Sequence, residues 1–78
     1  MNISHKIISR GILVVFVDDK SLDISGELTF YPPVFYADMI AIDYWNAPHQ
    51  NQKITDQEKQ EIISYLMNCN DATKIIID

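Results

Sequence analysis

Residue types that build many familiar protein sites are scarce in this 78-residue chain. Cys69 is the only cysteine, so no intramolecular disulfide can form. The histidines are His5 and His49, and with one cysteine they give no zinc-binding spacing. The two glycines, Gly11 and Gly26, are too far apart to form a phosphate-binding loop. We therefore expect no metal, no cofactor and a reducing compartment.

Long apolar runs and clustered basic residues are also absent. The longest unbroken apolar run, Ile12 to Val17, is far shorter than a membrane span, and the amino terminus lacks the ordered segments of a signal peptide. Six lysines and arginines are scattered among eleven aspartates and glutamates, which gives a net charge of −5. Phosphate binding needs clustered basic residues. We expect a cytoplasmic protein that binds neither membranes nor nucleic acid directly, and for which a basic partner is suitable.

The composition is that of a small globular protein. Apolar residues make up 47% of the chain, and residues 1–78 are expected to form a single domain. A domain of this size buries only roughly 60% of the surface that its unfolded chain exposes. The core is therefore thin, and the modest acidity has a simpler alternative explanation, which is that it keeps the protein soluble.

The first part of the chain predicts a series of strands. Lys6–Ser9 and Ile12–Val17 flank a turn signal at Arg10-Gly11. All residues of the second run are apolar, so both of its faces are apolar, which is typical of a strand covered on both faces. A hairpin turn at Asp18-Asp19-Lys20 is expected to follow. From Leu22 to Phe30 apolar and polar residues alternate, as in a strand with one face in water.

Glycine and proline mark the next boundaries. Gly26 occupies one of the alternate positions that otherwise carry apolar side chains, so we expect a bulge or a close backbone approach there. Pro32 and Pro33 cannot donate to a strand ladder, so the chain turns. A β-like run then resumes through Phe35–Ala37 and Met39–Ile42 towards Trp45, and a polar loop follows over 46–53.

One helix and a last strand complete the prediction. Thr55 and Glu58 have the spacing of a capping box, in which each side chain binds the backbone N–H of the other residue. The helix that they begin carries an apolar stripe of Ile62, Ile63, Leu66, Met67 and Cys69. The β-branched residues of Lys74–Ile77 predict a short strand.

These elements predict an α+β fold in the order β-β-β-β-α-β. We expect a single, mostly antiparallel sheet of about five strands, with the helix packed on one face. A single helix covers only one face of such a sheet, yet Ile12–Val17 offers apolar side chains to both. Either the sheet curls over itself, or the second face meets another chain.

The sequence contains no convincing catalytic group. A nucleophile would require Cys69 with His5 or His49 as its base. Cys69 lies at the end of the apolar stripe, where a buried and unreactive thiol is the usual outcome, and both histidines are most simply explained as solvated residues. A chain this small has little room for a buried cleft. We expect no catalytic residue and no enzyme activity.

Acidic and aromatic residues are the candidates for contact with a partner. Asp38 interrupts an apolar run, and Asp43 directly precedes Tyr44 and Trp45. Aromatic anchors with flanking charge give protein interfaces affinity and fast, oriented association. A structural role for Trp45 beside the start of the helix is the alternative. The predicted partner-binding residues are Asp18, Asp19, Tyr36, Asp38, Asp43 and Tyr44.

Several motifs together resemble a known family. They are Gly26-Glu27-Leu28, Phe35-Tyr36-Ala37-Asp38, Ile42, Tyr44-Trp45, Pro48, Ile54-Thr55, Glu58-Lys59 and Ile62-Ile63. From about Ile7 to Ile77 the chain resembles the short immunity proteins encoded beside bacterial polymorphic toxins, including those of contact-dependent growth inhibition systems. The resemblance implies a non-enzymatic protein that binds a cognate toxin domain, often a nuclease, and shields the producing cell.

The residues agree with this resemblance in kind, because an acidic surface could occupy the basic groove with which a nuclease binds phosphates. Active-site blockage and binding at another surface of the toxin both remain open. Two alternatives have no connection with a toxin. One is a homodimer that buries the second sheet face, and the other is a module that binds a small molecule through Tyr31, Phe35, Tyr36 and Trp45.

Overall fold

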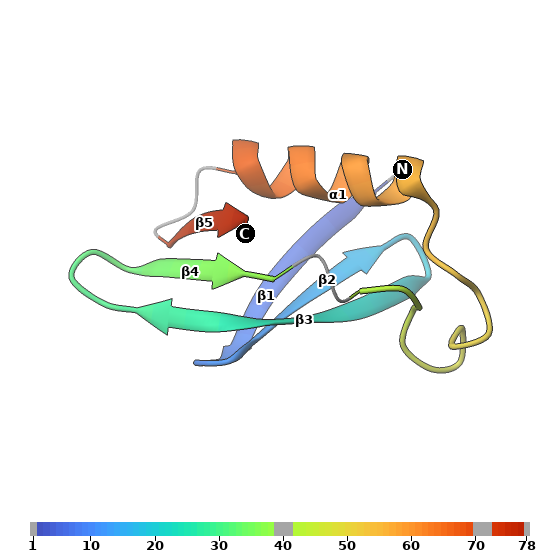
Figure 1. Cartoon of the computed structure of the whole chain (residues 1–78), viewed down its shortest axis with the longest axis horizontal. Helices are drawn as coiled ribbons and strands as arrows, with labels where there is room; N and C mark the ends of the chain where they lie inside the picture. The colour runs from blue at the N-terminus through green and yellow to red at the C-terminus, as the bar shows by residue number, and fades with distance from the viewer. Residues whose placement is uncertain (1, 39–41, 70–72, 78) are drawn as a thin grey trace.

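The structure is a computed structural model that describes residues 2–38, 42–69 and 73–77. Its elements are β1 (Ile3–Ser9), β2 (Ile12–Val17), β3 (Lys20–Thr29), β4 (Val34–Ala37), α1 (Asp56–Asn68) and β5 (Lys74–Ile77). The strands form one sheet, and α1 lies across one of its faces (Figure 1). The α+β class is therefore confirmed, with five strands and one helix in the described chain.

The sheet is mixed, and the expectation of a mostly antiparallel sheet is wrong. Its strands lie in the order β1-β2-β3-β4-β5, and the pairing of β4 with β5 is parallel, from Val34 opposite Lys74 to Ala37 opposite Ile77. The cause is the position of α1 between these two strands. A helical crossover returns the chain to the end at which the preceding strand began, so the next strand runs in the same direction.

Hairpins join the first three strands as predicted. Arg10 and Gly11 form the turn between β1 and β2, and Asp18 and Asp19 form the turn between β2 and β3. Asp18 has a φ of 53°, in the left-handed region that aspartate tolerates better than most residues. Its backbone N–H also donates to the Asn2 carbonyl at 2.9 Å, which fixes the beginning of the chain against this turn.

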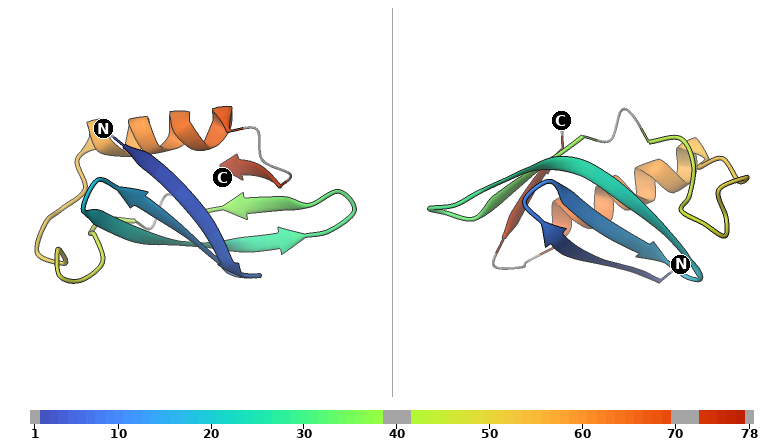
Figure 2. Two further views of the ribbon diagram at one scale, coloured as in Figure 1. Left: turned by 180° about the vertical axis from the view of Figure 1, so that it is seen from behind. Right: turned by 90° about the horizontal axis from the view of Figure 1, so that it is seen from below.

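Strand alternation separates the two faces of the sheet. Leu13 and Val15 on β2 lie beside Ile24 and Leu22 on β3, and all four side chains are buried on the face that α1 covers. The sheet twists and curls around the helix (Figure 2). The core that results consists of Leu13, Val15, Val17, Leu22, Ile24, Phe35, Ala37, Ile42, Trp45, Ile54, Ile62, Leu66 and Ile75.

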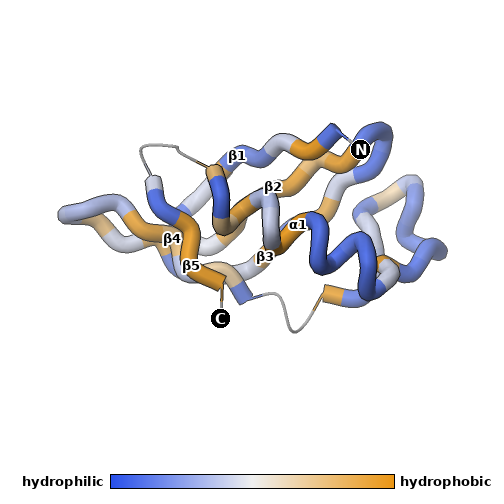
Figure 3. The backbone as a smooth tube through the Cα atoms, turned by 90° about the horizontal axis from the view of Figure 1, so that it is seen from above, coloured by the Kyte–Doolittle hydropathy of each residue, from blue (hydrophilic) through white to orange (hydrophobic). Residues whose placement is uncertain are grey.

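The opposite face of the sheet has no second layer in the described chain. Figure 3 shows that β2 and β5 carry the longest apolar stretches of the sheet. On the uncovered side of β2, Val14 is 9% exposed and Phe16 is 42% exposed. The prediction that both faces of β2 are covered is therefore wrong at Phe16. The curl of the sheet encloses α1 and does not bury the other face.

The chain between β4 and α1 departs from the predicted strand. Met39, Ile40 and Ala41 lie outside the described residues, and Ile42–Trp45 is irregular except for an isolated bridge between Tyr44 and Lys53. Ile42 and Trp45 are nevertheless buried in the core. Burial in the core, and not pairing in a strand ladder, therefore explains the apolar residues that suggested a strand here.

The capping box at the start of α1 is confirmed. Glu58 N–H donates to Thr55 Oγ1 at 3.1 Å, and Thr55 N–H donates to Glu58 Oε1 at 2.9 Å. Ile62 and Leu66 are the buried residues of the apolar stripe. Met67 was expected on the same stripe, but it is 66% exposed. One helix against a narrow sheet buries only the centre of its stripe.

Gly26 of β3 pairs with Ala37 of β4, and its surroundings leave no room for a side chain. A Cβ atom at this position would lie 2.6 Å from Phe35 Cε1, and closer still to the Tyr36 carbonyl oxygen. Phe35 is fully buried, so its ring cannot move aside without disturbing the core. The predicted close approach at Gly26 is thus confirmed.

The two glycines should respond differently to substitution by alanine. Gly26→Ala should lower the free energy of unfolding by about 2 kcal/mol or more, because the added methyl overpacks the Phe35 site. Gly11→Ala is the matched control, because its Cβ atom would meet nothing nearer than the Gly26 carbonyl oxygen at 3.8 Å. Urea unfolding of both variants measures the difference. Equal stability of the two variants would contradict this account of Gly26.

Candidate functional site

The sheet face away from α1 has no second layer in the described chain, and we name it the open face. Its side chains alternate with the core residues along β2, β3 and β4. They are Ile12, Val14, Phe16, Asp23, Ser25, Glu27 and Tyr36. An apolar stripe on β2 therefore runs beside a row of polar and acidic side chains on β3. This combination of an apolar centre and a charged border is typical of protein interfaces.

The pairing register of the strands determines where the charged residues lie on the open face. Lys6 on β1 and Asp23 on β3 lie on either side of Val14. Further along β3, Glu27 lies opposite Tyr36 of β4. Adjacent positions on paired strands bring their side chains within contact distance. The open face thus has a basic side at β1 and an acidic side at β3.

Two of the predicted partner-binding residues lie on or beside the open face. Tyr36 is partly exposed on β4, opposite Glu27. Asp38 directly follows β4, and its backbone N–H donates to the Ser25 carbonyl at 2.9 Å. The structure therefore brings Tyr36 and Asp38 together with Glu27.

Asp18 and Asp19 lie at another place, in the turn between β2 and β3. The Asp18 carboxylate accepts a hydrogen bond from the Asn2 backbone N–H at 3.0 Å. Asp19 Oδ2 lies 3.7 Å from Nε2 of His49 in the 46–53 loop. Both carboxylates thus have a local structural partner, and both remain exposed.

Asp43 and Tyr44 lie on the segment that leads into the same 46–53 loop. The Asp43 carboxylate is 3.6 Å from the Lys59 ammonium of α1, and the Tyr44 side chain is exposed. Trp45, the next residue, is buried and carries the Lys20 ammonium over its ring at 5.4 Å. Asp43 and Trp45 therefore each lie beside a lysine ammonium group, those of Lys59 and Lys20.

Some open-face residues were not singled out from the sequence. Asp23 and Glu27 looked like ordinary solvated positions of an alternating strand, and Phe16 looked like part of a covered apolar run. Asp23 Oδ1 accepts a hydrogen bond from Asn46 Nδ2 at 2.9 Å. Alternation along β3 predicted that these acids share one face. Only the pairing of β3 with β2 shows that Phe16 is on it too.

Both histidines have partners, which corrects the expectation that they are simply solvated. His5 Nδ1 lies 2.8 Å from the Tyr65 hydroxyl, and the two rings meet edge to face at 5.5 Å. This contact links β1 to α1. His49 lies beside Asp19. Cys69 is half-buried, and its thiol donates to the Leu66 carbonyl at 3.2 Å.

The aromatic residues considered for a small-molecule site do not gather. Phe35 and Trp45 are in the core, Tyr36 is on the open face, and Tyr31 is 99% exposed in the turn before β4. Residues 2–38, 42–69 and 73–77 also contain no group of three or more His, Cys, Asp or Glu side chains that could hold a metal ion. In the same residues, no helix has the length and apolar character needed to cross a membrane.

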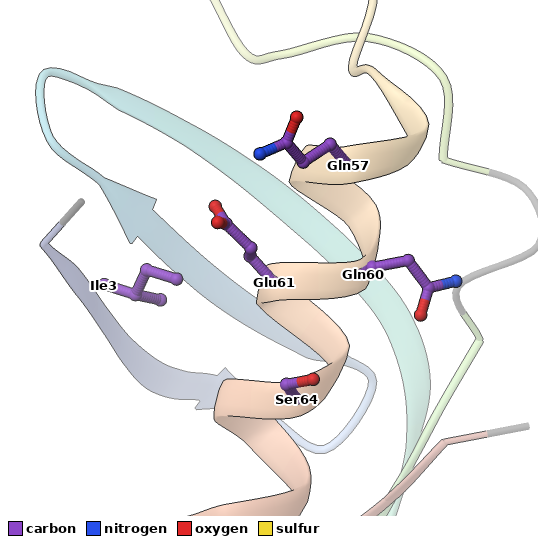
Figure 4. A pocket seen from close by; sticks show the side chains of 5 residues that line it. All are labelled: Ile3, Gln57, Gln60, Glu61 and Ser64. Atoms are coloured by element: carbon purple, nitrogen blue, oxygen red, sulfur yellow. The ribbon is translucent and has the colours of Figure 1, made fainter.

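Two grooves flank α1. One, of about 420 Å³, is lined by Ile3, Gln57, Gln60, Glu61 and Ser64. Figure 4 shows Gln57 and Glu61 projecting from α1 on the side where Ile3 of β1 lies. The other groove, of about 240 Å³, is lined by Met67 and the β5 residues Lys74–Ile77. Most residues that line the first groove are of polar types, and most that line the second are of apolar types.

Comparison with known proteins identifies the family. No curated protein and no solved structure matches the chain. The family model described as Immunity protein 74 matches residues 6–78, which include all of α1 and every strand except the beginning of β1. The chain therefore belongs to the Immunity protein 74 family.

Proposed function

We propose that this protein binds a cognate bacterial toxin domain and neutralises it by covering part of its surface. The toxin would belong to a polymorphic toxin system, such as contact-dependent growth inhibition, and would meet the immunity protein in the cytoplasm of the producing cell. Membership of the Immunity protein 74 family supports this assignment. The proposal includes no catalytic step, because binding alone prevents a toxin from reaching its substrate.

The uncovered sheet face is the observation that carries the proposal. A partly exposed Phe16 and the acidic residues Asp23 and Glu27 lie together on a sheet that no second layer covers in the described chain. Exposed apolar patches with a polar border mark interaction sites. The acidic side suits a basic partner, such as a nuclease domain with a phosphate-binding groove.

Co-expression tests the function directly. The toxin domain encoded in the neighbouring reading frame should stop the growth of cells that lack this protein, and growth should be restored when both are produced. The two purified proteins should also form a complex in size-exclusion chromatography. Cells that survive the toxin domain alone, or that die despite the immunity protein, would reject the proposal.

Charge reversal tests the electrostatic part of the proposal. Asp38→Lys combined with Asp43→Lys should slow association with the toxin domain by about tenfold at low salt and should weaken its salt dependence, because steering by opposite charges is screened by ions. Association rates at two salt concentrations measure the effect. The control variant, Asp43→Lys with Lys59→Asp, exchanges an ion pair of 3.6 Å and keeps the net charge.

The control keeps the net charge, so it should associate at nearly the wild-type rate if net charge, and not the position of the Asp43–Lys59 pair, sets the association rate. An unchanged rate and full protection in the Asp38 and Asp43 double variant would remove these residues from the toxin contact.

Self-association is the second candidate, and the register of the open face favours it. A two-fold axis parallel to β2 would place Lys6 of one copy over Asp23 of the other and stack the two apolar stripes. The two copies would bury the face that Phe16 exposes. This dimer is the alternative role without a toxin, and it would compete with a toxin for the same surface.

Sedimentation separates the two candidates. A wild-type dimer that Phe16→Lys and Lys6→Asp both convert to a monomer would support self-association through the open face. A wild-type monomer at about 100 µM would reject it, because a stable dimer forms well below that concentration. Addition of the toxin domain to a dimeric sample should release monomers if both partners use this face.

A further inference from the structure

The groove between β1 and the first half of α1 has features that folding does not explain. Its polar side chains are Gln57, Gln60, Glu61 and Ser64, which recur at the spacing of one helix face. On the strand side the groove is closed by Ile3. Gln57, Gln60 and Ser64 are exposed and Glu61 is half-buried, and together with Ile3 they line a hollow of about 420 Å³.

Glu61 is the exceptional residue of this groove. Its Oε2 atom is buried and has no hydrogen-bond partner among the described residues. A buried carboxylate oxygen without a donor costs free energy, because it loses its water and gains no replacement. The negative charge is shared by both oxygens of the carboxylate, so a cation in the groove could compensate it without reaching Oε2 itself.

The lining of the groove provides no such cation. None of its five residues is basic, and Glu61 is the acidic residue among them. The nearest ion pair on the helix joins Lys59 to Asp43, which leaves that ammonium engaged elsewhere. The groove is therefore negatively charged, and Gln57 projects on the same side of α1 as Glu61, whereas Gln60 points away from it (Figure 4).

This chemistry fits a guanidinium group. Arginine presents several N–H donors in one plane and forms strong charge-assisted hydrogen bonds with carboxylates. β1 is the edge strand of the sheet, so the groove and the open face meet along its free edge. A protein that covers the open face can reach around this strand with one long side chain.

We propose that the groove between β1 and α1 receives an arginine side chain of the toxin domain, with Glu61 as its principal acceptor. This inference rests on the proposed function and specifies one contact within it. The arginine relieves the unpaired carboxylate, so the free energy that Glu61 costs in the isolated protein is recovered only in the complex.

Two substitutions distinguish this contact from a structural role. Glu61→Gln keeps the shape of the side chain and removes its charge. Gln57→Lys adds an ammonium four residues before Glu61, at the spacing that forms an ion pair within a helix, and so occupies the groove from inside the chain. Asp56→Asn is the matched control, because it removes one negative charge from the same helix outside the groove.

Calorimetric titration with a catalytically inactivated form of the toxin domain measures the effect. Glu61→Gln and Gln57→Lys should each weaken binding by about ten- to a hundredfold, since a hydrogen bond to a charged group is lost. Both should leave the melting temperature of the free protein unchanged or higher, because the uncompensated charge is removed. Asp56→Asn should change the affinity by less than about threefold.

The outcomes separate this inference from the proposed function. Wild-type affinity in both groove variants would overturn the arginine contact and leave the toxin-binding function intact. Equal weakening by all three variants would also overturn it, because the effect would then reflect net charge alone. A wild-type protein that does not bind the toxin domain would reject the function, and the arginine contact with it.

Discussion

One helix has to bury the apolar side chains of a five-stranded sheet, and every other feature of this molecule depends on that constraint. α1 covers one face, and the sheet curls around it so that the beginning of β1 and the strand β5 each flank the helix. This arrangement produces a compact core from few residues. It also leaves an open face, two edge strands and two grooves beside the helix. The surfaces available for binding are therefore a consequence of the small size of the fold.

Local signals in the sequence were sufficient for much of the fold. The limits of β2 and β5 follow from β-branched runs, and the start of α1 follows from the Thr55 and Glu58 capping box. Gly26 was expected to mark a bulge or a close backbone approach because it interrupts an alternating pattern, and the close approach is what the structure has. Each of these signals acts between residues near one another in the chain, or through a pattern with a fixed period. Such features can be predicted without knowledge of tertiary contacts.

Features that depend on contacts between distant segments could not be predicted in the same way. The parallel pairing of β4 with β5 depends on where α1 returns the chain. The His5 contact with Tyr65 joins residues 60 positions apart, and neither residue has a neighbour in sequence that indicates it. Ile42 and Trp45 have the composition of a strand, but tertiary burial alone accounts for their apolar character.

The charges of the candidate site illustrate the same limit. The sequence shows acidic residues, but it does not show that Asp19 lies beside His49, or that Asp43 lies beside Lys59. The Lys59 ammonium lowers the field beside Asp43, which was expected to form one surface with Asp18, Asp19, Tyr36, Asp38 and Tyr44. Glu27 and Asp38 lie at a different place, where β3 pairs with β4. Acidity is therefore distributed over several surfaces of the described chain.

The separation of core and charge has a consequence for specificity. Among the described residues, no polar or charged side chain belongs to the buried set, so most surface charges can change without leaving an unpaired charge inside the protein. An immunity protein can thus adapt its surface to a particular toxin while its core stays the same. Glu61 is an exception, because one of its oxygens is buried and unpartnered in the described chain. A residue that lowers the stability of the isolated protein and gains a partner only in a complex discriminates strongly between ligands, since any partner lacking the matching donor leaves that cost unrelieved.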